Sequence, residues 1–161
     1  MFRFVSLRRI AFALVALAVL GLAGPVAAGE QVPFKGSLEG VDTTTPLTPP
    51  FVLATVEATG EATQLGLFTY TELDTVDTST RFGTGTFVFT AANGDTVFGT
   101  GTGQATFTPP NVLTIEGNEI ITGGTGRFAG ATGSFTVTRL KNTVTNVTTA
   151  SFTGTISAPS P

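Results

Sequence analysis

The chain contains no cysteine, no histidine and no tryptophan, and only one tyrosine and one methionine among its 161 residues. Without cysteine there is no disulfide and no thiol nucleophile. Without histidine there is no serine–histidine pair and no imidazole ligand for zinc. We therefore expect no metal and no other cofactor, and any catalysis would rest on carboxyl, guanidinium or phenol groups. The stability of the fold must come from an apolar core.

Positive charge is also scarce beyond the N-terminal segment. Residues 29–161 hold five basic residues and all eleven acidic ones, which gives a net charge of −6. Because nucleic-acid binding relies on lysine and arginine to neutralise phosphates, no nucleic-acid partner is expected. Asp74 and Asp77, in an expected acidic loop, offer oxygen ligands for calcium, but two carboxylates without a glycine-containing ligand loop do not define a site.

The first 28 residues have the layout of a secretory signal peptide. Arg3, Arg8 and Arg9 form a basic start, residues 10–22 form an apolar run, and Val26-Ala27-Ala28 supplies small residues for cleavage. The apolar run is shorter than the ~20 residues that span a bilayer, so we favour export over an uncleaved anchor. The prediction is an exported bacterial protein, extracellular or periplasmic, that meets a membrane only through this segment while it is uncleaved.

The sequence is rich in threonine, glycine and phenylalanine, with 32, 20 and 14 residues. Threonine and phenylalanine favour a pleated, half-buried surface, whereas glycine favours tight turns and bulges. No amphipathic helix is found after the signal segment. Residues 29–161 therefore predict a single all-β domain.

Eight strands are predicted, separated by clusters of glycine, proline, asparagine and aspartate. A proline-rich loop follows the first strand, and Asn93-Gly94-Asp95 is the clearest hairpin turn. Eight antiparallel strands close into a barrel whose interior holds side chains or one small ligand. The expected strands are 32–38, 51–59, 63–72, 80–90, 96–108, 112–122, 133–140 and 144–157.

Residues 120–137 predict two strands joined by a glycine corner. Gly124, Gly126 and Ala129 imitate a dinucleotide-binding turn. That turn must open a helix and be followed by an acidic residue roughly 20 positions on, and neither condition is met here. A nucleotide site is therefore not expected.

The same corner has the spacing Gly-Gly-Thr-Gly-x-Phe-x-x-Ala-x-Gly, formed by Gly123, Gly124, Thr125, Gly126, Phe128, Ala131 and Gly133. This spacing resembles the signature of the allene oxide cyclase and dirigent barrels. The resemblance implies an eight-stranded antiparallel, calycin-like barrel with an internal cavity. It also implies chemistry that works by shaping the conformation of a ligand. No catalytic residue is carried over, and the glycines and Phe128 are assigned to the turn.

Glycines alternate along two neighbouring expected strands, at Gly83 and Gly85 and at Gly99, Gly101 and Gly103. A spacing of two places each set on one face of its strand. The glycines either relieve crowding where the barrel bends or hollow out a ligand cavity. The first interpretation is favoured, since such barrels bend whether or not they bind a ligand.

Tyr70, Arg81 and Glu116 are the candidate ligand-binding residues. Glu116 lies in the strand that enters the glycine corner, and Tyr70 and Arg81 stand at strand ends, where they would face the rim of the barrel. The competing interpretation for each is an exposed residue without a role. Arg127, within the corner, is expected to anchor it to a carboxylate or to carbonyl groups.

Three functions remain open: an exported barrel that binds a small apolar or amphipathic ligand, a cyclase or isomerase, and a structural or interaction protein of the cell envelope. An outer-membrane barrel is less favoured because aromatic girdles are missing. An oligomer is possible for any of them. Ligand binding is preferred, and it requires a shared interior lined by at least three of Phe87, Phe89, Phe107, Phe135 and Phe152.

Overall fold

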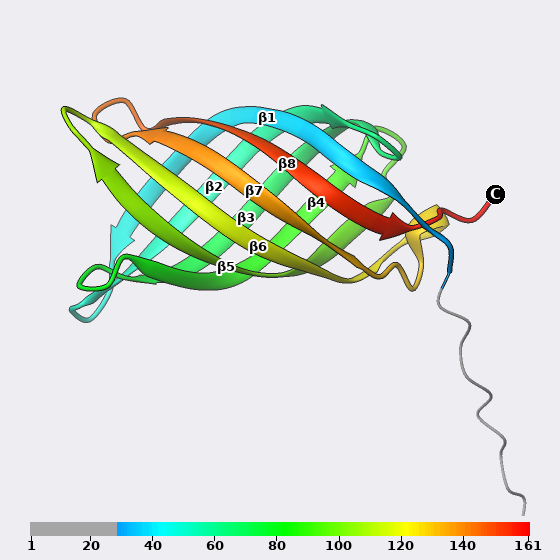
Figure 1. Ribbon diagram of the computed structural model, residues 1–161, viewed down its shortest axis with the longest axis horizontal. Helices are drawn as coiled ribbons and strands as arrows, with labels where there is room; N and C mark the ends of the chain where they lie inside the picture. Colours follow the sequence, from blue (N-terminus) through cyan, green and yellow to red (C-terminus); the bar gives the residue numbers. More distant parts are fainter. Residues whose placement is uncertain (1–28) are drawn as a thin grey trace, which may run out of the picture.

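The computed structural model describes residues 29–161, so the expected signal peptide lies outside the described residues. Eight strands run antiparallel to their neighbours and close a barrel in sequence order, with the last strand paired to the first (Figure 1). The predicted eight-stranded antiparallel barrel is confirmed. Its elements are β1 (Gln31–Pro46), β2 (Phe51–Ala62), β3 (Gly66–Asp77), β4 (Phe82–Ala91), β5 (Thr96–Thr108), β6 (Val112–Gly124), η1 (Gly126–Phe128), β7 (Gly133–Asn142) and β8 (Val147–Ser157).

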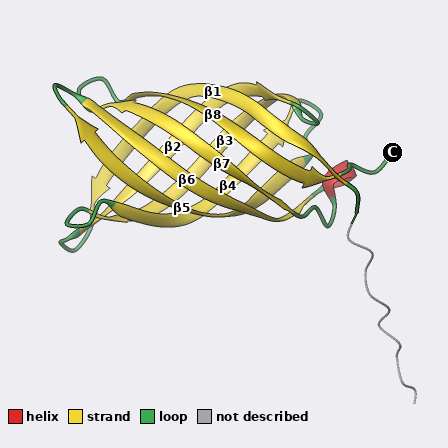
Figure 2. Cartoon of the chain, in the orientation of Figure 1, coloured by secondary structure: helices red, strands yellow, loops and turns green. Residues whose placement is uncertain are grey.

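The two ends of the barrel differ. Strands make up most of the described chain, and the short helical turn η1 lies at the end where both termini of the described chain are found (Figure 2). The connections β1–β2, β3–β4, β5–β6 and β7–β8 gather at the other end (Figure 1). No helix within residues 29–161 is long and apolar enough to cross a membrane.

β1 and β3 run farther than their apolar patterns predict. β1 continues to Pro46, so the proline-rich loop shrinks to residues 47–50, and β3 continues to Asp77. The expected acidic loop is therefore wrong, because Asp74 and Asp77 belong to a strand. The reason is that Asp42 and Asp74 occupy inward-facing positions, where buried basic groups replace the apolar contacts that normally mark a strand.

Aromatic rings fill the interior at the end that carries η1. Phe34 lies at their centre, with ring centroids 5.6, 5.4 and 5.2 Å from those of Phe89, Phe135 and Phe152. Most of these pairs adopt edge-to-face or tilted arrangements, which aromatic rings prefer. Phe87 is buried in the same cluster, so four of the five expected phenylalanines share one interior. The fifth, Phe107, is exposed near the end of β5.

The glycine corner closes this aromatic end. Gly126 has a φ of +57°, and a Cβ there would collide with the carboxylate of Asp95, so the corner packs tightly on the β4–β5 hairpin. Arg127 donates a hydrogen bond of 2.6 Å from Nη2 to the carbonyl of Gln64, and its Nε lies 3.8 Å from Asp95. Its guanidinium also lies 4.9 Å from the ring centroid of the buried Phe128. Arg127 thus ties the corner to two other turns.

The aromatic core predicts a strong dependence of stability on Phe89. We expect Phe89→Ala to lower the free energy of unfolding by about 3–5 kcal/mol, because a fully buried ring leaves a cavity that its neighbours cannot fill. Urea denaturation measures the change. Phe107→Ala is the matched control, and its exposed ring should contribute about 0.5 kcal/mol or less. Equal losses in the two variants would contradict this assignment of the core.

Candidate functional site

A layer of charged side chains crosses the barrel next to the aromatic core. Strand alternation turns each of these side chains toward the interior of the barrel. Such burial is rare for charged residues unless they are paired. The charged layer consists of Asp42, Glu72, Asp74, Glu119, Arg139 and Lys141.

Ion pairs within this layer join strands that are not neighbours in the wall. Arg139 on β7 donates a hydrogen bond from Nη1 to Glu72 on β3, and its Nη2 lies 3.6 Å from the carboxylate of Asp74. Lys141 donates hydrogen bonds from Nζ to Asp42 at 2.6 Å and to the hydroxyl of Thr44 at 3.0 Å. These pairs offset the cost of removing the charges from water.

Glu119 is the member of the layer whose carboxyl group is not fully satisfied. Its Oε2 is buried without a hydrogen-bond partner among the described residues, as is Nε of Arg139. Burial raises the pKa of Glu119 to about 8, and the nearby carboxylates of Glu72 and Asp74 add to the increase. Glu119 is therefore largely protonated at neutral pH.

Asp74 has a similar but smaller shift. Burial and the negative charge of Glu72 raise its pKa to about 7, against the opposing effect of Arg139. Burial, followed by the charge of Glu72, also raises the pKa of the Tyr70 phenol well above its ordinary value. Asp74 and Glu119 are thus the two carboxyl groups of the layer whose pKa is raised toward or above neutral pH.

An inner cavity of about 300 Å³ lies on the other side of the charged layer, at the end that carries the four connections. Asp74, Arg139 and Lys141 are among the layer residues that line it. The cavity therefore combines apolar walls with a charged floor. The walls include the apolar side chains of Val52, Val76, Leu113 and Ile115.

The alternating glycines serve both of the purposes that the sequence left open. A Cβ at Gly85 would collide with Asp74, and one at Gly101 would collide with the Glu119 carboxyl group, so these two positions relieve crowding. Gly83 and Gly103 line the inner cavity instead. Added Cβ atoms there would lie 3.0 Å from Val76 Cγ2 and 3.2 Å from Ile115 Cγ2, so side chains at these positions would narrow the cavity.

The three candidate residues lie in three different environments. Arg81, in the turn before β4 with a φ of +57°, lines the inner cavity. Tyr70 does not stand at a rim, because β3 continues past it, and its ring is buried 4.7 Å from that of Phe89. Glu116 faces outward and accepts a hydrogen bond of 2.9 Å from the hydroxyl of Thr138. The structure does not bring the three together.

Sequence reasoning missed the charged layer, although the alternation contained a signal for it. In β3, Glu72 and Asp74 continue the inward-facing series begun by Phe68 and Tyr70. In β7, Arg139 and Lys141 likewise continue a series that begins at Phe135. Extending the period of two through charged residues would have placed acids and bases in one interior.

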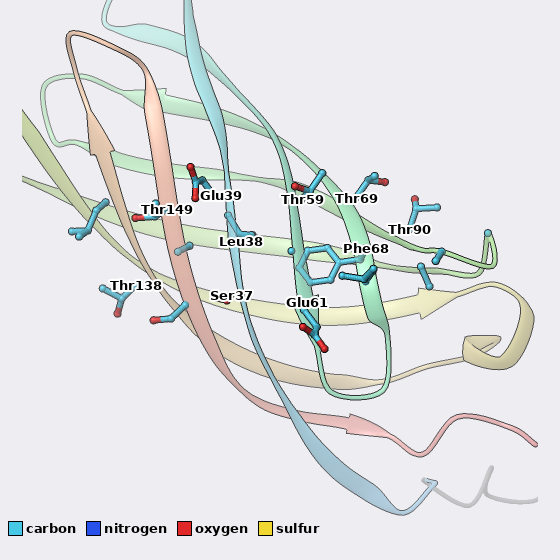
Figure 3. A pocket seen from close by; sticks show the side chains of 18 residues that line it. Ser37, Leu38, Glu39, Thr59, Glu61, Phe68, Thr69, Thr90, Thr138 and Thr149 are labelled. Atoms are coloured by element: carbon cyan, nitrogen blue, oxygen red, sulfur yellow. The ribbon is translucent and has the colours of Figure 1, made fainter.

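A larger hollow of about 1160 Å³ lies on the outer wall of the barrel (Figure 3). Its lining mixes apolar residues with outward-facing threonines and carboxylates such as Glu39, Thr59, Thr69 and Thr149 (Figure 3). The hollow is broad and open to solvent, whereas a ligand site typically encloses most of the surface of its ligand. The smaller inner cavity is therefore the candidate site.

A solved structure supports the arrangement of the strands. The structure of a pterocarpan synthase dirigent protein superimposes with a TM-score of 0.59 over 89% of this chain and 98% of that chain, at 11% sequence identity. This chain has a dirigent-type barrel. No family model and no curated protein matches it. At this identity the likeness concerns the fold of the dirigent-type barrel, and its site residues must be judged by their own geometry.

The raised pKa of Glu119 predicts a pH-dependent stability. The folded state holds this proton more tightly than an exposed glutamate with a pKa of 4.5 does, so its contribution is fully present below about pH 4.5 and is lost as the pH rises through 8. Replacing Glu119 by glutamine removes this proton. Between pH 5 and 8, the free energy of unfolding should therefore fall less steeply with pH in Glu119→Gln than in the unmodified chain. The two slopes should differ by up to about 1.4 kcal/mol per pH unit.

Urea denaturation at several pH values measures this slope. Glu116→Gln is the matched control, because Glu116 lies on the same strand but faces solvent, and this variant should keep the slope of the unmodified chain. An unchanged slope in Glu119→Gln would contradict the burial of a protonated carboxyl group at this position.

Proposed function

We propose that this dirigent-type barrel binds one small amphipathic ligand in its inner cavity. The observation that carries the proposal is the combination of apolar walls and a charged floor within a single concave site. Ligand pockets typically combine mostly apolar walls with a few convergent polar groups. At about 300 Å³, the cavity is suited to a ligand with a single ring or a short chain.

The polar head of this ligand is uncharged and faces Asp74. Arg139 and Lys141 are already hydrogen-bonded to Glu72 and Asp42, so a fully charged head would compete with existing ion pairs. Asp74 is held more loosely, 3.6 Å from Arg139, and its pKa of about 7 allows it to donate or accept a hydrogen bond. A hydroxyl or phenol group fits these requirements best.

The dirigent likeness is compatible with this proposal, since the matched protein is named a pterocarpan synthase. The aromatic half of the barrel is filled by its own side chains, as a structural or interaction protein of the envelope requires, but the half with the inner cavity is not. Export to the periplasm or the extracellular space remains part of the proposal, supported by the signal-like sequence of residues 1–28.

Binding of 4-ethylphenol, a single-ring amphipath, tests the proposal. We expect residues 29–161 to bind one molecule per chain in a calorimetric titration. Ala54→Phe should weaken this binding by about tenfold or more, because the added ring occupies the inner cavity. Thr55→Phe is the matched control: it adds the same ring at the next residue, where the side chain faces outward, and should change binding by about twofold or less.

Circular dichroism checks that both variants keep the fold, since overpacking an interior costs about 1–3 kcal/mol. Two results would contradict the proposal: no binding of 4-ethylphenol by the unmodified chain, or equal binding of 4-ethylphenol by the chain that carries Ala54→Phe.

A second candidate function is a cyclase or isomerase in the same cavity. It is favoured by Asp74, because a carboxyl group with a pKa of about 7 at the floor of an apolar cavity has the properties of a general acid and base. Asp74→Asn should then abolish turnover of the natural substrate while 4-ethylphenol still binds. If turnover survived the substitution, Asp74 would have no such role.

A further inference from the structure

The rim around the mouth of the inner cavity carries exposed apolar residues from all four connections or the strand ends beside them. Their side chains are exposed by 41–69%, although they are large apolar groups. We call this set the rim ring. It consists of Leu47 and Phe51 at β1–β2, Phe82 at β3–β4, Phe107 at β5–β6 and Val144 at β7–β8.

The opposite end of the barrel lacks such a ring. Within its connections, at residues 63–65, 92–95 and 125–132, the large apolar side chains are turned inward: Leu65 is 4% exposed and Phe128 is 1% exposed. The exposed large apolar residues close to these connections in the sequence, Leu67, Phe98 and Ile120, lie on the strands themselves. The apolar ring is therefore a property of one end, not of the fold in general.

Charge is nearly absent from the same rim. The stretches 46–51, 108–112 and 142–147 contain no charged residue, and 77–82 contains only Asp77 and Arg81, whose charges cancel. Recognition of a partner by charge would require charged residues on the rim that face opposite charges on the partner. The rim ring instead suits a partner that accepts apolar side chains and carries no strong charge of its own.

We propose that the rim ring docks on the surface of a lipid bilayer, with the mouth of the inner cavity facing the lipid. Five side chains of this exposure present roughly 400 Å² of apolar surface. Two copies meeting rim to rim would bury roughly 800 Å² of apolar surface, divided among separate turns rather than gathered in one complementary patch. A bilayer accommodates a ring of protruding turns without needing a complementary shape, and its binding strength scales with the apolar area inserted.

Docking needs only the rim ring and does not depend on the proposed ligand. If both proposals hold, an amphipathic ligand passes from the bilayer into the inner cavity without crossing water. The two are therefore tested with separate variants.

Co-sedimentation with phosphatidylcholine vesicles tests the docking. The experiment uses residues 29–161, because all eight strands and their pairings lie within them. We expect this chain to bind the vesicles. The double variant Phe51→Asp/Phe82→Asp should bind them at least about tenfold more weakly, because two phenylalanine rings no longer contact the bilayer. Raising the salt concentration from about 0.1 to 1 M should leave binding in place, since the rim has no net charge.

Two further variants keep the result interpretable. Val144→Asp, at an exposed turn, also removes a rim contact and carries little risk for folding. Phe98→Asp is the control, because it places the same charge at an exposed ring on the outer wall of β5 and should leave vesicle binding within about twofold. Ala54→Phe should keep vesicle binding while losing 4-ethylphenol, which separates this proposal from the proposed function.

Three outcomes would overturn the docking proposal. The first is no sedimentation of the unmodified chain with vesicles. The second is an equal loss of binding in Phe98→Asp and in the rim variants. The third is a dimer in analytical ultracentrifugation that the rim variants dissociate while vesicle binding is absent, which would assign the rim ring to a second copy of the chain.

Discussion

The contact between Arg139 and Glu72 is the interaction on which the arrangement of the interior depends. It joins β7 to β3, which lie on opposite walls of the eight-stranded ring. Asp74, Asp42 and Lys141 extend it into a layer of paired charges. Removing one partner of such a buried pair typically costs about 3–5 kcal/mol, because the other charge is left unpaired. The pairing therefore holds both the strands and the side chains of the layer in place.

This layer gives the two halves of the barrel different roles. On one side, the rings around Phe34 pack together and supply the stability that a chain without disulfides requires. On the other side, apolar side chains cannot cover the paired charges without loss of their polar contacts. Small residues such as Gly83 and Gly103 line an unfilled space there. The charged layer therefore forms the polar floor of the cavity. The mouth of the cavity opens between turns that carry exposed apolar residues.

Sequence patterns predicted the barrel well, because threonine and phenylalanine alternate with a period of two and Asn93-Gly94-Asp95 marks a turn unambiguously. They predicted the site poorly. The apolar residues stop before the strands do, so the sequence pattern predicts loops at Asp42 and Asp74 although their strands continue to Pro46 and Asp77. Which acid faces which base depends on the closure of the ring, and the spacing within a single strand does not contain that information.

We propose that the charged layer leaves half of the barrel open for a small amphipathic molecule. Native mass spectrometry of residues 29–161 purified from the envelope of the native host tests it most directly. The account predicts one small molecule per chain, released on denaturation, with an uncharged polar head on an apolar body. A chain that is empty in the native spectrum, together with an experimental structure in which side chains fill the space above Asp74 and Arg139, would contradict it.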